Sequence, residues 1–311
     1  MNYSYLFGPV QSRRLGVSLG IDLVQSKICS LNCVYCECGK TTELTLERKE
    51  YAPSDAIIAE LEEYLSTTPV LDYITFGGSG EPTLNTGIGK VVRFLKDSFP
   101  RYACALLTNG TLFYRPEVRS EVMVFDLVLP NLDAVSKSAF NKVNRPHPEL
   151  DNRRIIEGLW DFRKEYKGTI WLEIFIVPGI NDTPSELQLL KKAAFRINPD
   201  RVQLNTLDRP GTCGWVRPAT IDHLKSISSV FTPLPVEIIT RQAQNYPLWE
   251  KTTISPESIR SLIARRPSTL EEIASLTGLT INEARATLSA MVGNGSITLH
   301  AAGKRTFYRT F

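Results

Sequence analysis

Between Leu71 and Leu207, short apolar segments alternate with longer segments of helical periodicity. Strands separated by helices of this length form a parallel sheet, because parallel neighbours need a crossover connection, which is usually a helix. Such crossovers are right-handed almost without exception. The fold class is therefore α/β, and we expect the sheet to curl into a partial or full parallel (β/α) barrel. The expected strands are 73–76, 103–107, 127–129, 171–177 and 202–205, and the expected helices between them include 88–99, 155–166 and 185–196.

Polar and glycine-rich segments follow these strands. In parallel α/β folds the working site lies at the carboxyl ends of the strands. We therefore expect these segments to converge on one mouth of the barrel, although an ordinary barrel scaffold has similar loops. They are 77–82 (GGSGEP), 108–110 (TNG), 130–133 (PNLD), 178–182 (PGIND) and 205–211 (NTLDRPG).

Three of the six cysteines, Cys29, Cys33 and Cys36, lie within eight residues with the spacing C-x3-C-x2-C. This spacing is poor for disulfides and favours metal binding or redox chemistry. Three thiolates can ligate three irons of a cubane and leave the fourth iron open, whereas electron-transfer cubanes use four cysteines. An open position is what chemistry at a metal needs. The alternatives are a zinc knuckle with Cys38 as a cramped fourth ligand, or three unrelated buried thiols.

The triad with Tyr35 before its last cysteine, followed by the glycine-rich segment 76–82 (FGGSGEP), resembles the radical SAM superfamily. The resemblance covers residues 5 to about 218, and segments 7–16 and 205–211 are similar to the branch of the tRNA wyosine (wybutosine) synthase-like Fe–S oxidoreductases. It implies a radical SAM barrel with a [4Fe–4S] cluster on the three cysteines and S-adenosyl-L-methionine (SAM) bound beside it. It also implies reductive cleavage of SAM to a 5′-deoxyadenosyl radical, with an electron donor of flavodoxin or ferredoxin type.

The resemblance also implies which residues contact SAM. Glycines permit a close approach of the backbone, and a carboxylate accepts charge-assisted hydrogen bonds from an ammonium group. Gly78, Gly80 and Glu81 are therefore expected at the methionine amino group. The other implied contacts are Thr108 and Asn109 from the next strand end, Asn131 and Asp133 from the one after it, and Tyr35, Val177 and Gly179 around the adenine. For Asp133 an N-terminal helix cap is an equal alternative.

The sequence departs from the wyosine synthases at its cysteines. Those enzymes carry a further set of N-terminal cysteines for a second cluster, whereas the 28 residues before Cys29 contain none. Cys104 lies within an expected strand and is interpreted as a small buried residue. Cys213, in a loop at the expected mouth, is the candidate for a catalytic thiol, with an ordinary loop cysteine as the alternative. The sequence therefore predicts the chemistry of the branch and does not predict wyosine synthesis itself.

We place the barrel domain at residues 1–245. A linker is expected at 246–255, and a second unit after it. Residues 256–311 are predicted to form a winged helix-turn-helix domain: a helix at 256–265, two helices opened by capping boxes at 268–271 and 280–283, and a hairpin of 296–300 and 305–309 around Gly303. This unit holds seven basic and four acidic residues, so it carries the whole net charge of +3. That asymmetry hints at an acidic partner.

Three functions fit these features. The preferred one is modification of a tRNA base, with RNA bound by the hairpin residues Lys304, Arg305 and Arg309 and stacked on Phe307 and Tyr308. The first alternative is modification or activation of a protein or peptide that docks on 256–311. The second is a DNA-binding Fe–S redox regulator. No apolar run is long enough to span a membrane and the N-terminus does not resemble a signal peptide, so we expect a cytoplasmic protein.

Overall fold

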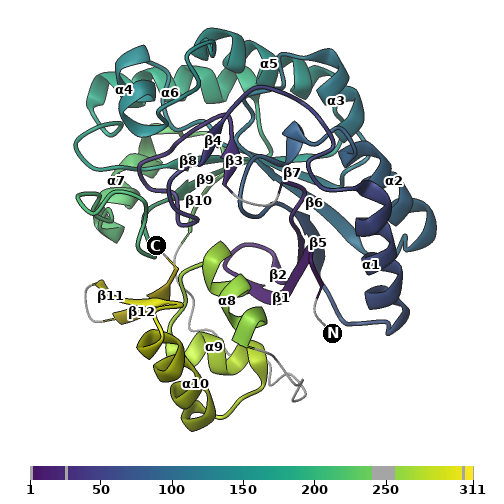
Figure 1. Cartoon of the computed structure of the whole chain (residues 1–311). Coiled ribbons are helices and arrows are strands. Elements are labelled where there is room, and N and C mark those ends of the chain that lie inside the picture. Colours follow the sequence, from purple (N-terminus) through teal and green to yellow (C-terminus); the bar gives the residue numbers. More distant parts are fainter. Residues whose placement is uncertain (1–2, 25–26, 240–255, 303–304, 311) are drawn as a thin grey trace.

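The computed structural model describes residues 3–24, 27–239, 256–302 and 305–310, and its centre is one eight-stranded sheet (Figure 1). β1 pairs with β2 in antiparallel fashion, and every other neighbouring pair in this sheet is parallel. In spatial order the strands are β1 (Leu6–Ser12), β2 (Gly16–Ile21), β5 (Tyr73–Phe76), β6 (Ala103–Thr108), β7 (Leu127–Pro130), β8 (Thr169–Phe175), β9 (Arg201–Asn205) and β10 (Val236–Ile238).

The parallel α/β fold is thereby confirmed, and all five predicted strands are present within two residues of their expected ends. β1, β2 and β10 were not predicted; they extend the sheet at both edges. The sheet is open between β1 and β10, in agreement with the partial form of the expected barrel.

Helices cover the outer face of the sheet (Figure 1). The three predicted helices are present as α2 (Ile88–Ser98), α5 (Asn152–Glu165) and α6 (Pro184–Ile197). Their apolar residues face the strands, where they join a continuous buried core. The remaining helices around the sheet are α1 (Ser54–Ser66), α3 (Pro116–Val122), α4 (Lys137–Val143) and α7 (Ile221–Val230), with a short 3-10 turn at Pro82–Leu84 and a two-stranded ribbon of β3 (Ile28–Cys29) and β4 (Glu43–Leu44).

The C-terminal segment contains α8 (Pro256–Arg265), α9 (Leu270–Thr277) and α10 (Ile281–Gly293), followed by a hairpin of β11 (Thr298–Ala302) and β12 (Arg305–Arg309). This is the expected order of elements. It has its own apolar core, which includes Ile263, Ile273, Leu288, Met291 and Ile297. The expected linker 246–255, residues 240–245, Gly303 and Lys304 lie outside the described residues.

The first capping box was predicted one residue too early. Thr269 and Glu272 form the box that opens α9, not Ser268 and Glu271. The reason is tertiary, because the backbone N–H and C=O of Ser268 are both hydrogen-bonded to Tyr308 of β12, at 3.1 and 2.8 Å. The carbonyl of Ser268 is thereby used outside the helix, and α9 begins one residue later. The second box, Thr280 with Glu283, is confirmed.

Phe307 does not offer its ring to a base. Its side chain is fully buried, and the guanidinium groups of Arg209 and Arg305 lie over it at 5.9 and 4.9 Å from the ring centroid. The stacking role predicted for this residue is therefore wrong. The alternating pattern of a hairpin does not tell which face is covered. Here Arg209 lies over the ring, and α8 and α9 pack against β12. Among the described residues, no helix has the length and apolar character needed to cross a membrane.

Candidate functional site

The cysteine loop begins on β3 and runs over the carboxyl ends of the sheet strands. Cys29 is buried at the end of β3, Cys33 and Cys36 are half-buried, and all three are free thiols. Burial raises the pKa of Cys33, and the charges of Asp133, Cys36 and Cys29 raise it further. Burial likewise raises the pKa of Cys29.

The end of α4 and the residues after it hold the cysteine loop from one side. Val34 N–H donates to the carbonyl of Val143 at 2.9 Å, Asn32 N–H to that of Asn144 at 2.9 Å, and His147 N–H to that of Ser30 at 2.9 Å. Sequence reasoning did not find these contacts. The backbone here is irregular, because Asn144 is the C-cap of α4 and Arg145 has φ of +45°.

Two side-chain amides donate to the cysteine sulfurs. Nδ2 of Asn109 lies 3.5 Å from Sγ of Cys29, and Nδ2 of Asn144 lies 3.4 Å from Sγ of Cys33. Asn109 comes from the end of β6 and Asn144 from the end of α4. Asn109 was expected at SAM, and Asn144 was not singled out by sequence reasoning.

The glycine-rich segment 77–82 lies directly against β3. Glu81 N–H donates to the carbonyl of Ile28 at 3.0 Å, one residue before Cys29. A Cβ atom on Gly80 would lie 2.0 Å from that same carbonyl oxygen, so only glycine fits. Gly78 has φ of +148°, which also favours glycine, and it packs on Asp22. The structure thus brings the two strongest motifs of the sequence together.

The carboxylate of Glu81 joins this segment to the TNG segment. Oε1 accepts hydrogen bonds from Thr83 N at 3.1 Å, Thr83 Oγ1 at 2.6 Å and Thr108 Oγ1 at 2.6 Å, and Oε2 accepts one from Asn109 N at 2.7 Å. Burial raises the pKa of Glu81, and these donors only partly offset that effect. Since a carboxylate has about four acceptor positions, its capacity is already used. Its expected contact with the SAM ammonium stays a prediction.

Tyr35 and Asp133 meet on the other side of the cysteine loop. The ring of Tyr35 stacks on Phe175 with centroids 3.7 Å apart, and its hydroxyl donates to Asp133 at 2.5 Å. Asp133 also accepts from Asn144 Nδ2 at 2.7 Å and Phe175 N at 2.8 Å. Burial raises the pKa of Asp133. The N-cap of α4 is Ser136, so the alternative role of Asp133 as a helix cap does not hold.

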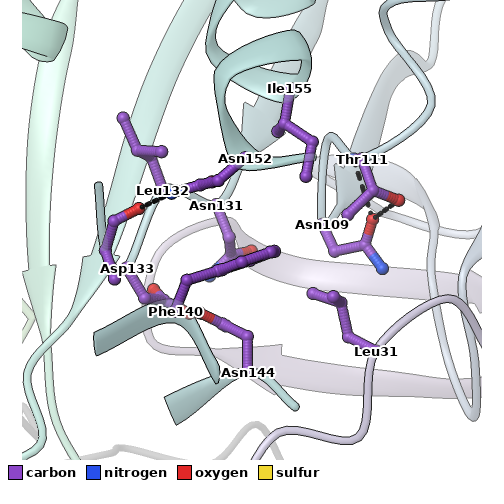
Figure 2. A pocket seen from close by; sticks show the side chains of 11 residues that line it. Leu31, Asn109, Thr111, Asn131, Leu132, Asp133, Phe140, Asn144, Asn152 and Ile155 are labelled. Carbon is purple, nitrogen blue, oxygen red and sulfur yellow. Dashed lines mark hydrogen bonds between the residues drawn. The ribbon is translucent and has the colours of Figure 1, made fainter. Parts of the chain in front are cut away.

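A small cavity of about 10 Å³ lies beside these groups (Figure 2). Asn109 and Asn144 both line it, and Asn131 and Asp133 come from the segment after β7. Val177 is buried beyond Phe175 in the same apolar cluster as Tyr35. Most of the residues predicted to contact SAM are therefore grouped around the cysteine loop, in two networks centred on Glu81 and Asp133.

The loop that carries Cys213 lies on the cysteine loop. Cys213 N–H donates to the carbonyl of Val34 at 3.0 Å, and Thr212 Oγ1 donates to the carbonyl of Cys36 at 3.0 Å. A Cβ atom on Gly211 would lie 2.7 Å from the carbonyl oxygen of Tyr35. The Cys213 side chain is half-buried and packs in the cluster with Val34 and Phe175. These contacts give it a packing role, and its role as a catalytic thiol stays a prediction.

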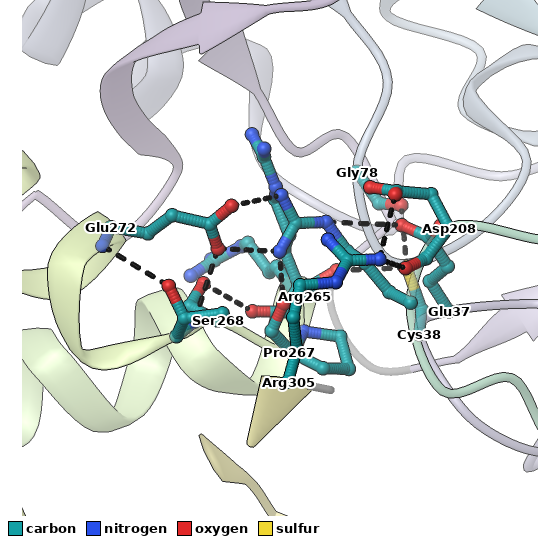
Figure 3. A network of polar contacts seen from close by, with 12 residues as sticks. Glu37, Cys38, Gly78, Asp208, Arg265, Pro267, Ser268, Glu272 and Arg305 are labelled. Carbon is teal, nitrogen blue, oxygen red and sulfur yellow. Dashed lines mark hydrogen bonds and ion pairs between the residues drawn. The ribbon is translucent and has the colours of Figure 1, made fainter. Parts of the chain in front are cut away.

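The C-terminal unit contacts the sheet domain at the carboxyl ends of its strands, through buried charges (Figure 3). Arg209, after β9, donates from Nη1 and Nη2 to Glu272 of α9 at 2.6 and 2.8 Å, and these side chains are 2% and 3% exposed. Nε of Arg265 donates to Asp22, after β2, at 2.9 Å. Because β2 and β9 lie near opposite edges of the open sheet, the unit bridges the gap between those edges (Figure 1).

Cys38 links three parts of this site. Its sulfur lies 3.4 Å from the carbonyl oxygen of Gly78 and 3.1 Å from that of Arg265, so both are within reach of its one S–H. A hydrogen bond with Cys38 and the charge of Lys27 lower the pKa of Cys36. Asp22, the partner of Arg265, also accepts from Ser79 Oγ at 2.7 Å, so the C-terminal unit is coupled directly to the glycine-rich segment.

Within the described part of the chain, no three His, Cys, Asp or Glu side chains are grouped around a point that would suit a single metal ion. In a cubane each thiolate binds a different iron, so the three sulfurs need not converge on one point. Three free thiols on one loop, two of them with N–H donors, suit an iron–sulfur cubane by the chemistry of their donors.

Comparison with known proteins decides the family. Residues 23–190, more than half of the chain, match the Radical SAM superfamily. The chain belongs to this superfamily. A UPF0026 protein of Helicobacter pylori is 33% identical over 100% of this chain and 99% of its own length. A protein of Brachyspira hyodysenteriae named GTPase Obg is 37% identical over 86% of this chain, but the chain spans only 40% of that relative.

A solved structure supports the fold of the radical SAM chain. The radical SAM methyltransferase from Sphaerobacter thermophilus superposes with a TM-score of 0.53, covering 71% of this chain and 66% of that chain. The sequence identity is 16%, so this likeness concerns the fold alone. The resemblance inferred from the cysteine triad and the FGGSGEP segment is therefore confirmed at the level of the superfamily.

Proposed function

We propose that this protein is a radical SAM enzyme whose Cys29, Cys33 and Cys36 hold a [4Fe–4S] cluster beside a bound S-adenosyl-L-methionine. The observation that carries the proposal is the close packing of the cysteine loop on the glycine-rich segment and on the ends of β6 and β7. When bound, the reduced cluster supplies one electron that cleaves SAM to methionine and a 5′-deoxyadenosyl radical, which removes a hydrogen atom from the substrate.

In this scheme the chain's own residues bind and orient SAM. Gly78 and Gly80 let the backbone of the glycine-rich segment approach closely, and Glu81 with Thr108 holds that segment to the end of β6. Tyr35, Asn131, Asp133 and Val177 form the opposite wall, where the stacked ring of Tyr35 offers an apolar surface for adenine. The buried position of these groups excludes water from the region where a radical must survive.

Anaerobic reconstitution with iron and sulfide tests the proposal. We expect about four irons per chain, a reduced-cluster EPR signal and 5′-deoxyadenosine after addition of dithionite and SAM. The Cys29→Ala, Cys33→Ala and Cys36→Ala variants are expected to lose all three signals. Cys104→Ala is the matched control, because this fully buried thiol lies in β6 away from the cysteine loop and is expected to leave the cluster unchanged. Zinc without iron in the wild-type protein would overturn the proposal.

For the substrate we infer a tRNA base, with residues 1–245 as the catalytic domain and 256–311 as a winged helix-turn-helix domain that contacts the RNA. The support is the similarity to the wyosine synthase branch and the basic surplus of the C-terminal unit. The structure limits which residues can take part, because Arg265 and Arg305 are hydrogen-bonded to Asp22 and Asp208 of the barrel domain. Arg285, exposed on α10, is the remaining candidate from the third helix.

Salt-dependent binding of unmodified tRNA to the full chain tests the substrate class. Each lost phosphate contact lowers the slope of log K against log salt by about one. Arg285→Gln is therefore expected to weaken tRNA binding and lower this slope. A protein or peptide that binds without salt dependence, while tRNA does not bind, would favour the alternative substrate class. Tight duplex DNA binding without SAM cleavage would favour the redox regulator. A cytoplasmic location and a flavodoxin or ferredoxin as electron donor complete the proposal.

A further inference from the structure

Asn144 lies at the end of α4 with its side chain 3% exposed, and its amide has two N–H donors. One points to Oδ2 of Asp133 at 2.7 Å and the other to Sγ of Cys33 at 3.4 Å. Its carbonyl oxygen Oδ1 has no hydrogen-bond partner among the described residues. The carboxylate of Asp133 can only accept, so the amide nitrogen must face it, and this fixes the donor toward Cys33.

Asn109 presents the same arrangement to Cys29. Its Nδ2 donates to Ser30 Oγ at 2.9 Å and to Cys29 Sγ at 3.5 Å. Its Oδ1 accepts from Thr111 N at 3.0 Å and Thr111 Oγ1 at 2.7 Å, which fixes the orientation of this amide as well. Two cysteines from the one loop thus receive one amide donor each, from two separate elements of the sheet domain.

We propose that Asn144 and Asn109 are positioning residues that raise the reduction potential of the cluster by donating hydrogen bonds to Cys33 and Cys29. The inference rests on the proposed function, because it assumes that these sulfurs ligate iron. Reduction adds negative charge that is shared by the ligand sulfurs, so an N–H donor stabilises the reduced cluster more than the oxidised one. Hydrogen bonds to the sulfurs are among the factors that set the potentials of such clusters.

The geometry favours this role over a purely structural one. A structural Asn144 would need only Asp133, which already receives hydrogen bonds from Tyr35 and from the backbone of Phe175. Asn152 provides a comparison within the same cavity (Figure 2). It is also a buried amide with an unpartnered Oδ1, but its Nδ2 donates to the carbonyls of Ala134 and Val135 at 3.0 and 2.8 Å.

The experiment is an EPR-monitored redox titration of the reconstituted full-length protein without SAM. Asn144→Leu removes the donor and keeps a similar side-chain volume, and Asn152→Leu is the matched control. At the wild-type midpoint potential, we expect the ratio of reduced to oxidised cluster in Asn144→Leu to fall by about threefold to tenfold. A tenfold fall equals a shift of about 59 mV to more negative potential for a one-electron couple. Asn152→Leu is expected to keep the wild-type midpoint.

If Asn144→Leu does not retain iron, Asn109→Leu tests the same mechanism at Cys29.

Two results would overturn the inference: an unchanged midpoint in the variant tested, or an equal shift in Asn152→Leu. A wild-type protein that assembles no cluster would instead overturn the proposed function, and this inference with it.

Discussion

The buried pair between Arg209 and Glu272 is expected to hold the C-terminal unit against the sheet domain. Arg209 donates to both carboxylate oxygens of Glu272, at 2.6 and 2.8 Å, and also to the carbonyl of Pro267 at 2.6 Å. Neither side chain is more than 3% exposed. The perturbation is Glu272→Gln, which removes the charge and keeps a side chain that can complete the capping box of α9.

Two estimates of the free energy lost in Glu272→Gln agree. Burial by itself raises the pKa of Glu272, but the hydrogen bonds and charge of Arg209, with the charge of Arg266, lower it from 4.5 to about 2. This fall corresponds to about 3 kcal/mol. Removing one partner of a buried ion pair costs about 3–5 kcal/mol when the other charge is left uncompensated. Glu37 lies 3.7 Å from Nε of Arg209 and still compensates part of its charge, which favours the lower end of this range. We therefore expect Glu272→Gln to weaken the docking of the C-terminal unit on the sheet domain by about 3 kcal/mol.

Amide hydrogen exchange of α8, α9 and α10 measures this loss, because it reports local opening separately from global unfolding. Since the pKa of Glu272 is lower in the folded protein than its ordinary value, the stabilisation is fully present above about pH 4.5. It is lost as the pH falls from there to about 2. The difference between wild type and Glu272→Gln is therefore constant from pH 7 to pH 5 and disappears near pH 2.

An exposed ion pair gives the control. Asp55 pairs with Lys90, and these side chains are 87% and 52% exposed, so Asp55→Asn is expected to change stability by less than about 0.5 kcal/mol. A loss below about 1 kcal/mol in Glu272→Gln, or a loss that grows toward low pH, would refute the reasoning. Either result would mean that the pair is solvated or that Arg209 finds another partner.

Three further outcomes are expected. Asp22→Asn breaks the contact with Arg265 and loosens Ser79 of the glycine-rich segment. The affinity for SAM, measured by anaerobic calorimetry, is therefore expected to fall several-fold, and the control Asp55→Asn is expected to keep the wild-type affinity. Gly80→Ala puts a Cβ atom 2.0 Å from the carbonyl oxygen of Ile28, so the glycine-rich segment must move. The iron content after reconstitution is therefore expected to fall, and retention of full iron content and SAM binding would contradict this. Phe162→Ala empties a fully buried site whose ring contacts Phe113 and Tyr166, and a cost of about 3–5 kcal/mol is expected in denaturant unfolding; a cost below about 1 kcal/mol would show that the site collapses.

Charge counting in the C-terminal unit did not foresee which of its charges bind within the chain. Its net positive charge indicated an acidic partner, and that call stays a prediction, but Arg265 and Arg305 bind acidic groups of the sheet domain. A sum over residues does not tell which charges face solvent and which face another part of the same chain. The error at Phe307 has the same physical origin, because exposure depends on what covers a face and not on the pattern that creates it.

Sequence reasoning named most of the residues around the cysteine loop but not the contacts that join them. Glu81 and Thr108 were both expected at SAM, yet the hydrogen bond between them was not foreseen. For Asp133 the position of Ser136 at the start of α4 excludes the helix cap, and the contact with SAM stays a prediction. Asn144 and His147 were missed because the hydrogen bonds of their backbone go to a loop far away in the sequence.

The sequence by itself determined the strands and helices of the sheet domain, the cysteine triad and the glycine-rich segment. These features depend on residues within a few positions of one another, where periodicity, spacing and backbone preference act directly. Only the tertiary structure decided the contacts of Cys33 with Asn144, Arg209 with Glu272, and Arg265 with Asp22, which are 111, 63 and 243 residues apart. Such contacts arise when separate elements pack, and packing depends on the shape and burial of the whole molecule.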